Sequence, residues 1–295
     1  MTITEAELAS LTYGCELEYE GISQATAAKV VAETVGGTAN YEGRHLSNWV
    51  VTMPDGRKWQ VVSDGSLSGA SAEVVTPILR ITDMDILQQV VRAMRKARAK
   101  VNARTGLHVH VGAQGMTPTM IKNLVRTFYK QEELILKAAG TQPNRIARYT
   151  RKTDHAFADK ICRLRTPTMD AINAAWFGHY NPHPYHYDEH RYRALNLNNL
   201  WDSKGTVEFR YHEQSLNAGK IRAAVLLDLL IVLRAKMAKA SSAKSPRPYS
   251  EASAKYDFRV FFLRLGAIGS YFKNPRKHLM ANLPGSAAWK DGRHD

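Results

Sequence analysis

The sequence of 295 residues is poor in cysteine and has no long apolar run. Its two cysteines, Cys15 and Cys162, are too few and too far apart for a disulfide framework, so we expect a reducing, cytoplasmic environment. The longest apolar stretch, residues 223–233, is interrupted by Asp228 and is too short to span a bilayer. The N-terminus has no basic-then-apolar segment of the kind that directs secretion. We therefore expect a soluble protein without a membrane partner.

Motifs of several enzyme classes are also absent. No glycine-rich loop ends in Lys-Ser or Lys-Thr, so phosphates would have to be held without a Walker A motif. No Gly-x-Ser-x-Gly turn occurs, and no Cys–His arrangement surrounds Cys15 or Cys162. Covalent catalysis by serine or cysteine is therefore not expected, and Cys15 is interpreted as a small core residue.

The charge is strongly positive, +14 at pH 7, and unevenly distributed. From Asn217 to the end, fifteen Lys or Arg residues stand against five acids. Excess positive charge favours anionic partners such as nucleotides, acidic peptides or nucleic acid. The alternative is a solvated basic surface that only aids solubility.

One stretch predicts a strand with two chemically different faces. From Leu107 to Gly112, apolar and polar residues alternate, so His108 and His110 share one face and Leu107 and Val109 the other. Gly106 and Gly112 bound the stretch. A histidine pair on one strand face is a modest indication of a metal or phosphate site.

Two further stretches repeat this pattern. Near the N-terminus, residues 14–19 place Glu16 and Glu18 together, opposite Cys15. Later, residues 206–211 place Glu208 beside Arg210. The three stretches predict a sheet with one face on the core and one face that carries carboxylate, imidazole and guanidinium groups.

Such a face has an electrostatic cost. Two carboxylates at positions i and i+2 lie roughly 7 Å apart and repel by about 2 kcal/mol at an effective dielectric near 20. Divalent cations are the simplest compensation, and carboxylates with histidine are common ligands for them. The alternative is that the strands merely have a solvated outer face.

The rest of the chain shows the periodicity of an α+β protein. We predict helices at 23–34, 83–102, 119–139, 220–239 and 256–266, and further strands at 49–51, 58–62, 72–76 and 191–198. The last of these strands would pair with the Glu208 strand and place Asn196 and Asn198 on one face. Residues 240–253 are rich in Ser, Ala, Lys and Pro and predict a linker. We therefore divide the chain into a catalytic domain, 1–239, and a basic linker with a C-terminal extension, 240–295.

The order of these motifs resembles that of the amidoligases, a branch of the glutamine synthetase and glutamate–cysteine ligase superfamily of carboxylate–amine ligases. The resemblance runs from about Tyr13 to about Leu233. It rests on these stretches in sequence order: Gly14 to Glu18, Trp59, Asp64 to Ser66, Glu73 to Pro77, Gly106 to His110, Ala194 to Leu197, and Thr206 to Arg210. Thr76 stands where a serine is more usual, and Ala70 and Ser71 replace an expected glycine; neither departure removes an acid or a histidine.

The resemblance implies a fold and a site. The fold would be a curved, mostly antiparallel sheet with a metal-binding polar face and helices packed on the other face. Glu16, His108 and Glu208 would bind one Mg²⁺ or Mn²⁺ ion, and Glu18 and Glu73 a second. His110 and Arg210 would contact ATP, and the second-rank candidates for nucleotide or substrate contacts are Asp64, Ser66 and Asn196. Catalysis would rest mainly on Arg210, Glu208 and Glu18.

The resemblance also implies a reaction, the transfer of the γ-phosphoryl group of ATP to a substrate carboxylate. An amine would then attack the resulting acyl phosphate and form an amide. We expect carboxylate and amine substrates, with glutamyl or peptide groups among the candidates. Two alternatives remain. The first is a metal-dependent hydrolase that uses no ATP. The second is a nucleic-acid-binding protein that uses the basic C-terminal segment, and nucleic acid is a less favoured partner than the acid and amine substrates.

Overall fold

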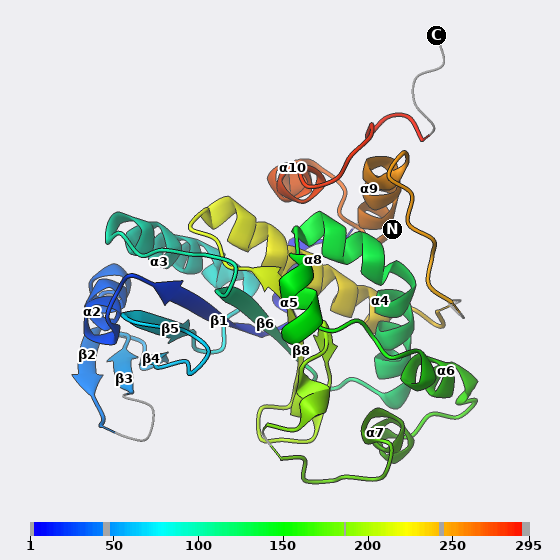
Figure 1. Ribbon diagram of the computed structural model, residues 1–295, viewed down its shortest axis with the longest axis horizontal. Coiled ribbons are helices and arrows are strands. Elements are labelled where there is room, and N and C mark those ends of the chain that lie inside the picture. The colour runs from blue at the N-terminus through cyan, green and yellow to red at the C-terminus, as the bar shows by residue number, and fades with distance from the viewer. Residues whose placement is uncertain (1–2, 44–47, 186, 242–244, 291–295) are drawn as a thin grey trace.

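A computed structural model describes residues 3–43, 48–185, 187–241 and 245–290 (Figure 1). The protein is α+β, with one open, antiparallel sheet of eight strands in the order β2-β3-β4-β5-β1-β6-β8-β7. The strands are β1 (Tyr13–Glu20), β2 (Thr38–Tyr41), β3 (Trp49–Thr52), β4 (Lys58–Val62), β5 (Ser71–Val75), β6 (Gly106–Gly112), β7 (Leu195–Asn196) and β8 (Thr206–Glu213). The predicted fold class is confirmed.

The two-faced strands occupy the centre of this sheet. β1 lies between β5 and β6, and β6 pairs with β8. Their apolar residues, among them Cys15, Val109 and Phe209, are buried in one continuous hydrophobic core, as the alternation predicted. The charged residues of the same strands therefore share the opposite face.

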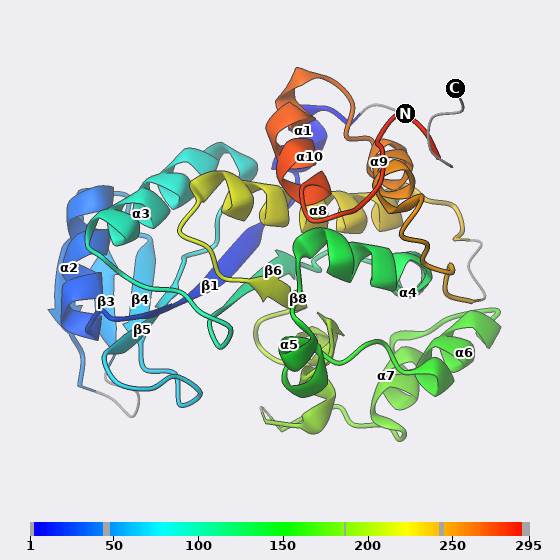
Figure 2. The ribbon, with the colours of Figure 1, turned by 45° about the horizontal axis from the view of Figure 1, so that its top comes forward.

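A layer of helices covers the apolar face. Along this layer α2 (Gln24–Val35) packs on α3 (Met84–Lys96), α3 on α8 (Ala218–Met237), and α8 on α4 (Pro118–Ala139) (Figures 1 and 2). α8 is apolar on nearly all sides because it is enclosed by the sheet and its neighbours. Within the described part of the chain, none of the helices combines the length and apolar character that crossing a bilayer requires.

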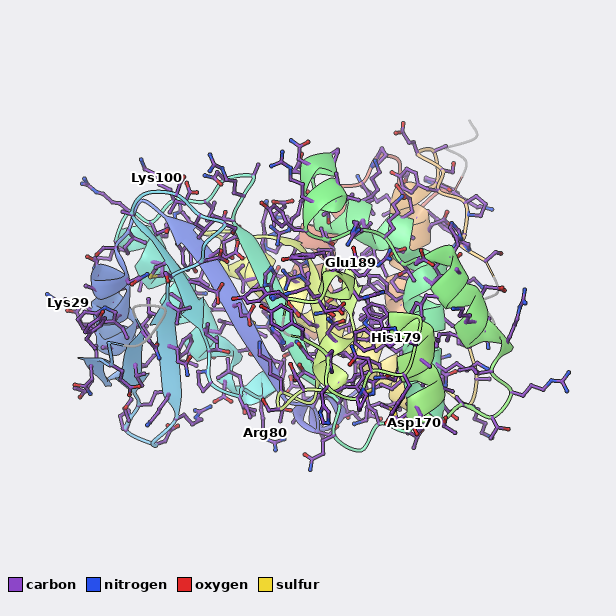
Figure 3. The ribbon with its side chains drawn as sticks, turned by 60° about the horizontal axis from the view of Figure 1, so that its bottom comes forward. Lys29, Arg80, Lys100, Asp170, His179 and Glu189 are labelled. Atoms are coloured by element: carbon purple, nitrogen blue, oxygen red, sulfur yellow. The ribbon has the colours of Figure 1, made fainter. Side chains whose placement is uncertain are left out.

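The segment between α4 and β8 lies beside the polar face at the β8 edge. It contains α5 (Pro143–Arg148), α6 (His155–Arg163), α7 (Met169–Phe177), η2 (Glu189–Arg191) and η3 (Asn198–Leu200). In Figure 3, Lys29 and Lys100 point outward at the α2 end, whereas Asp170 and His179 mark the α7 end. Glu189 of η2 lies between them, in the chain that leads into β7.

Two predicted elements are shorter than expected. The helix predicted to reach Asn102 ends at Lys96, because Arg98 adopts a left-handed conformation (φ 63°) and the Ala99 amide donates to the Met94 carbonyl. Its N-cap is Asp83. The helix stop lacks the usual glycine, so the sequence did not reveal it.

The strand predicted at 191–198 is reduced to Leu195–Asn196. The side chain of Asn196 accepts a hydrogen bond from the Asn198 amide at 2.9 Å, and the chain turns into η3 instead of extending. Asparagine side chains often compete with the sheet in this way. The pairing with β8 is nevertheless present, since Asn196 lies opposite Glu208.

The C-terminal segment packs on the helix layer. α9 (Ala254–Arg264) packs on α4, and α10 (Lys273–Met280) packs on α8. Phe258 and Phe262 are fully buried in the same core as the sheet. The division into a catalytic domain, 1–239, and a linker with a C-terminal extension, 240–295, stays a prediction.

Candidate metal and active site

Strand register brings the predicted acids and histidines together. Glu16 on β1 lies opposite His108 on β6, and His110 on β6 lies opposite Glu208 on β8. On the other side of β1, Glu18 lies opposite Glu73 on β5. Directly opposed residues point to the same face with Cβ atoms about 5 Å apart. The polar face therefore holds two clusters side by side, joined by β1.

The first cluster combines Glu16, His110 and Glu208, which offer ligand atoms within 4.8 Å of one another. His110 Nε2 lies 3.1 Å from Glu16 Oε1 and 3.9 Å from Glu208 Oε1. His108 belongs to the same place, because its Nδ1 lies 3.0 Å from Glu16 Oε2 and 3.7 Å from Glu208 Oε1. The structure thus brings the expected trio of Glu16, His108 and Glu208 together and adds His110 to it.

The electrostatics of the first cluster favour cation binding. Burial raises the pKa of Glu16. His110, His108 and Lys204 lower it by more than burial raises it, so this pKa lies well below its usual value. Burial also opposes ionisation of Glu208, yet Arg210 and His110 lower its pKa to about 2. Burial lowers the pKa of His108 to about 4. At neutral pH the cluster therefore offers two carboxylates and a neutral imidazole, the protonation states that a divalent cation requires.

His110 Nε2 is an orphaned polar atom. It is buried and close to both carboxylates, yet within the described residues it makes no hydrogen bond of acceptable geometry. Buried polar atoms normally make a hydrogen bond of good geometry, so a ring nitrogen that lies near two carboxylates without one fits a position for a metal ligand. Its other ring nitrogen lies 3.3 Å from Thr206 Oγ1, which can orient the ring.

The second cluster consists of Glu18, Asp64 and Glu73, again within 4.8 Å of one another. Among the described residues, no Lys or Arg nitrogen lies within 4.0 Å of these carboxylates. Burial, with Asp64 nearby, raises the pKa of Glu18 to about 7, and burial with the neighbouring acids raises that of Glu73 well above its usual value. Three carboxylates so placed need either protons or a cation, and oxygen-only ligands suit Mg²⁺.

Asp64 and Ser66 come from the turn before β5. The carboxylate of Asp64 accepts a 2.6 Å hydrogen bond from the Ser66 amide, and Ser66 itself is exposed at the edge of the site. Asp64 was expected to contact substrate or nucleotide, and the structure places it as a third acid of the second cluster. A β-turn with Asp at its start is stabilised by this side-chain contact.

Arg210 and two asparagines hold Glu208. The Arg210 guanidinium donates to Glu208 Oε1, and the amides of Asn196 and Asn199 donate to Oε2 at 2.7 and 3.2 Å. Arg210 Nε is buried and without a hydrogen-bond partner in the described chain. Glu208 therefore fixes the position of Arg210, and the Nε–H group of Arg210 is available to donate to a ligand.

The sequence analysis missed three residues of the site. Arg145 of α5 is buried, with NH2 3.2 Å from His108 Nε2, and it also donates to the Arg210 carbonyl. Lys204, in the turn before β8, lies 3.2 Å from Glu16 Oε1. Asn199 follows the Asn196 motif and lies 3.3 Å from His110 Nδ1.

Only indirect signs of these three residues exist in the sequence. A Cβ on Gly106 would stand 1.8 Å from Arg145 NH2, so the glycine before the histidine strand marks the space that Arg145 occupies. No local pattern distinguished Arg145 from the other basic residues of its segment.

Comparison with known proteins agrees with this arrangement. A search of curated proteins gives no match. A family model described as "putative amidoligase enzyme" matches residues 9–232, which include every strand and the whole candidate site. That span is more than half of the chain. The chain belongs to this amidoligase family.

Proposed function

We propose that the protein is an ATP-dependent carboxylate–amine ligase that forms an amide through an acyl phosphate. The observation that carries the proposal is the pair of adjacent clusters on one sheet face, one of carboxylate and histidine, the other of carboxylates alone. Family membership supports a ligase, and ATP and metal dependence are part of the proposal.

Two divalent ions, Mg²⁺ or Mn²⁺, would fit this site. Glu16, Glu208 and the two histidines would hold the ion with mixed ligands, and Glu18, Asp64 and Glu73 the ion with oxygen ligands. Bound there, the ions would neutralise the phosphate charge and orient the γ-phosphoryl group. The nitrogen ligands make Mn²⁺ as acceptable as Mg²⁺ at the first position.

The protein's own residues would do three things. Arg210, held by Glu208, would stabilise the charge of the phosphoryl group as it moves to the substrate carboxylate. Lys204, whose side chain is 43% exposed, stands at the edge of the site, where an anionic group would enter. Arg145 lies behind His108 and donates from its guanidinium to Nε2 of the ring at 3.2 Å. In the second step the amine attacks the acyl carbon and phosphate leaves, which needs no protein nucleophile.

The substrates proposed are an acid and an amine, with glutamyl or peptide groups as the first candidates. The basic edge at Lys204 and the overall charge of +14 favour an anionic acceptor. A screen of carboxylic acids against amines for release of ADP identifies the pair. The candidates differ in charge and length, so the screen also measures how far the site extends.

The decisive experiment measures ADP and phosphate release with Mg²⁺, ATP, an acid and an amine, and then omits each component in turn. The ligase requires all four. Turnover of an amide or phosphodiester with metal but without ATP would instead identify a hydrolase. The matched variants are Glu73→Gln in the site and Glu33→Gln on the exposed face of α2. Only the first should lose ADP release.

A further inference from the structure

A second charged region lies away from the carboxylates. A hollow of about 560 Å³ opens between α4, α9 and the segment that joins α8 to α9. Its polar lining includes Lys130, Gln131, Arg247, Tyr256, Arg264 and Lys290. α9 packs on α4 and α4 packs on β8. In Figures 1 and 2, α9 lies on the side of α4 away from β8. The hollow is lined by residues of α4 and α9 and therefore lies on the outer side of the helix layer.

The hollow has an excess of positive charge. Its one acid, Asp257, is already paired, because Arg247 NH2 lies 2.6 Å from one carboxylate oxygen and Ser253 donates to the other at 2.7 Å. Among the described residues, no carboxylate lies within 4.0 Å of the side-chain nitrogens of Lys130, Arg264 or Lys290. Three cations without an acidic partner, from segments far apart in sequence, line one hollow, and this excess of positive charge favours an anionic ligand.

Groups other than cations line the hollow as well. Gln131 Oε1 is buried without a partner in the described chain, so it can accept a hydrogen bond from a hydroxyl or an amine. Tyr256 lines the wall beside the cations. Aromatic rings beside cations are the combination on which unpaired bases stack while their phosphates are neutralised.

The surrounding chain has the same character. From residue 233 to the end, thirteen Lys or Arg residues stand against four acids. This part of the chain lies beyond the family match, which ends at 232. Most of the lining of the hollow comes from this part of the chain, whereas Lys130 and Gln131 lie within the family match.

We propose that the hollow binds the phosphate backbone of a single-stranded nucleic acid, with Lys130, Arg264 and Lys290 on the phosphates and the ring of Tyr256 against a base. A strand fits better than a free nucleotide, because the hollow is open and the cations come from three separate segments. An acidic peptide would offer no base for the ring of Tyr256 to stack on.

The test uses the full chain and a fluorescein-labelled oligothymidine of twenty nucleotides. Binding is followed by fluorescence anisotropy in EDTA without ATP, so that the carboxylate clusters hold neither metal nor nucleotide. Three phosphate contacts predict that the logarithm of affinity falls with the logarithm of salt concentration with a slope of about −2, at about −0.7 per contact.

Paired variants locate the site. Lys130→Glu with Arg264→Glu should lower the affinity at least tenfold and reduce the slope to about −0.7, since one contact is left. The control, Arg92→Glu with Lys96→Glu on α3, makes the same charge change on exposed positions outside the hollow, and should keep the affinity within twofold. Tyr256→Ala should weaken binding about fivefold or more without changing the slope.

Three results would overturn the proposal. The first is no binding at 50 mM salt, and the second is equal loss of affinity in the α3 control. The third is displacement of the oligonucleotide by polyglutamate or free nucleotide as efficiently, per charge, as by unlabelled oligonucleotide. The ligase assay is run on the same variants, so a failure here is distinguishable from a failure of the proposed enzyme.

Discussion

The pKa values of two glutamates on strand β1 are shifted in opposite directions: that of Glu16 is lowered and that of Glu18 is raised. Glu16 faces two imidazoles and Lys204, whereas Glu18, two residues later, faces two further carboxylates. Burial raises the pKa of both groups, and only the neighbours differ. Residues of the same type can therefore have different roles at neighbouring positions.

Glu16 is the residue whose charge the first cluster depends on most. Glu16→Gln keeps the shape of the side chain and removes one negative charge, so we expect ADP release to fall about 100-fold or more while the fold is retained. Steady-state rates and circular dichroism measure the two effects. Glu33→Gln, the same change on an exposed position of α2, serves as control. Equal rates in Glu16→Gln and wild type would contradict the assignment.

The raised pKa of Glu18 predicts that the difference in stability between the wild type and Glu18→Gln depends on pH. Its pKa of about 7 in the folded protein exceeds the usual 4.5, so the unfolded chain releases this proton first as pH rises. The wild type should then lose stability relative to Glu18→Gln between about pH 4.5 and pH 7, by on the order of 3 kcal/mol. Urea unfolding of both proteins in EDTA at several pH values gives the difference, in which titrations of groups outside the cluster cancel.

Mg²⁺ should reverse this loss of stability in the wild type. Mg²⁺ that binds only the folded protein stabilises it by about 2.7 kcal/mol at a hundredfold excess over the dissociation constant. The wild type should gain this above pH 7, and Glu18→Gln should gain less. A stability difference that is flat with pH and insensitive to Mg²⁺ would show that Glu18 is neither buried nor a ligand as described.

At the scale of elements, the polar face of the sheet extends only as far as the register between β6 and β8 is regular. The register of β6 and β8 shifts between Leu107 and Val109, where β8 contains one extra residue. Beyond this bulge, Tyr211 and His212 both reach the same side and donate to Asp228 of α8 at 2.5 and 2.8 Å. The bulge therefore ends the site and ties its last strand to the helix layer.

The contact between β6 and α5 can be tested by a double-mutant cycle. Gly106→Ala would place a methyl group 1.8 Å from Arg145 NH2, so Arg145 must leave His108, and we expect ADP release to fall about tenfold or more. Arg145→Ala alone should lower activity similarly. In the double variant the clash is gone, so Gly106→Ala should add little to Arg145→Ala. Additive losses would place the effect of Gly106 elsewhere.

At the scale of the whole molecule, the C-terminal segment is part of the core on which the site rests. Phe262 of α9 is fully buried and stacks on Phe258, with ring centroids 5.8 Å apart. α4, on which α9 packs, also packs on β8. Loss of packing at α9 should therefore be felt by the entire chain.

Phe262→Ala tests this cooperativity. Removing a buried phenylalanine costs about 3–5 kcal/mol, and we expect one unfolding transition, shifted to lower temperature, by circular dichroism and by loss of ADP release alike. Tyr180→Ala, which truncates an aromatic ring that is 55% exposed, should change stability by no more than about 0.5 kcal/mol. If activity survives to the wild-type temperature, residues 240–295 form a separate unit.

Much of the site was predictable because it depends on local alternation. The period of two placed Glu16 with Glu18, His108 with His110 and Glu208 with Arg210, and each pair lies on one face as expected. The limits of α3 and β7 were not predictable in this way. A left-handed arginine ends α3 and an asparagine side chain ends β7, and neither residue is a regular terminator.

The sequence by itself therefore determined the faces of the strands, the core, and the residue types available for chemistry, because these follow from the spacing of neighbours along the chain. Only the tertiary structure decided which pairs became clusters. It moved Asp64 beside Glu18 and Glu73, and brought Arg145 and Lys204 to the histidines and Glu16. These contacts join positions that are distant in sequence, and strand register and helix packing set them, which no local pattern encodes.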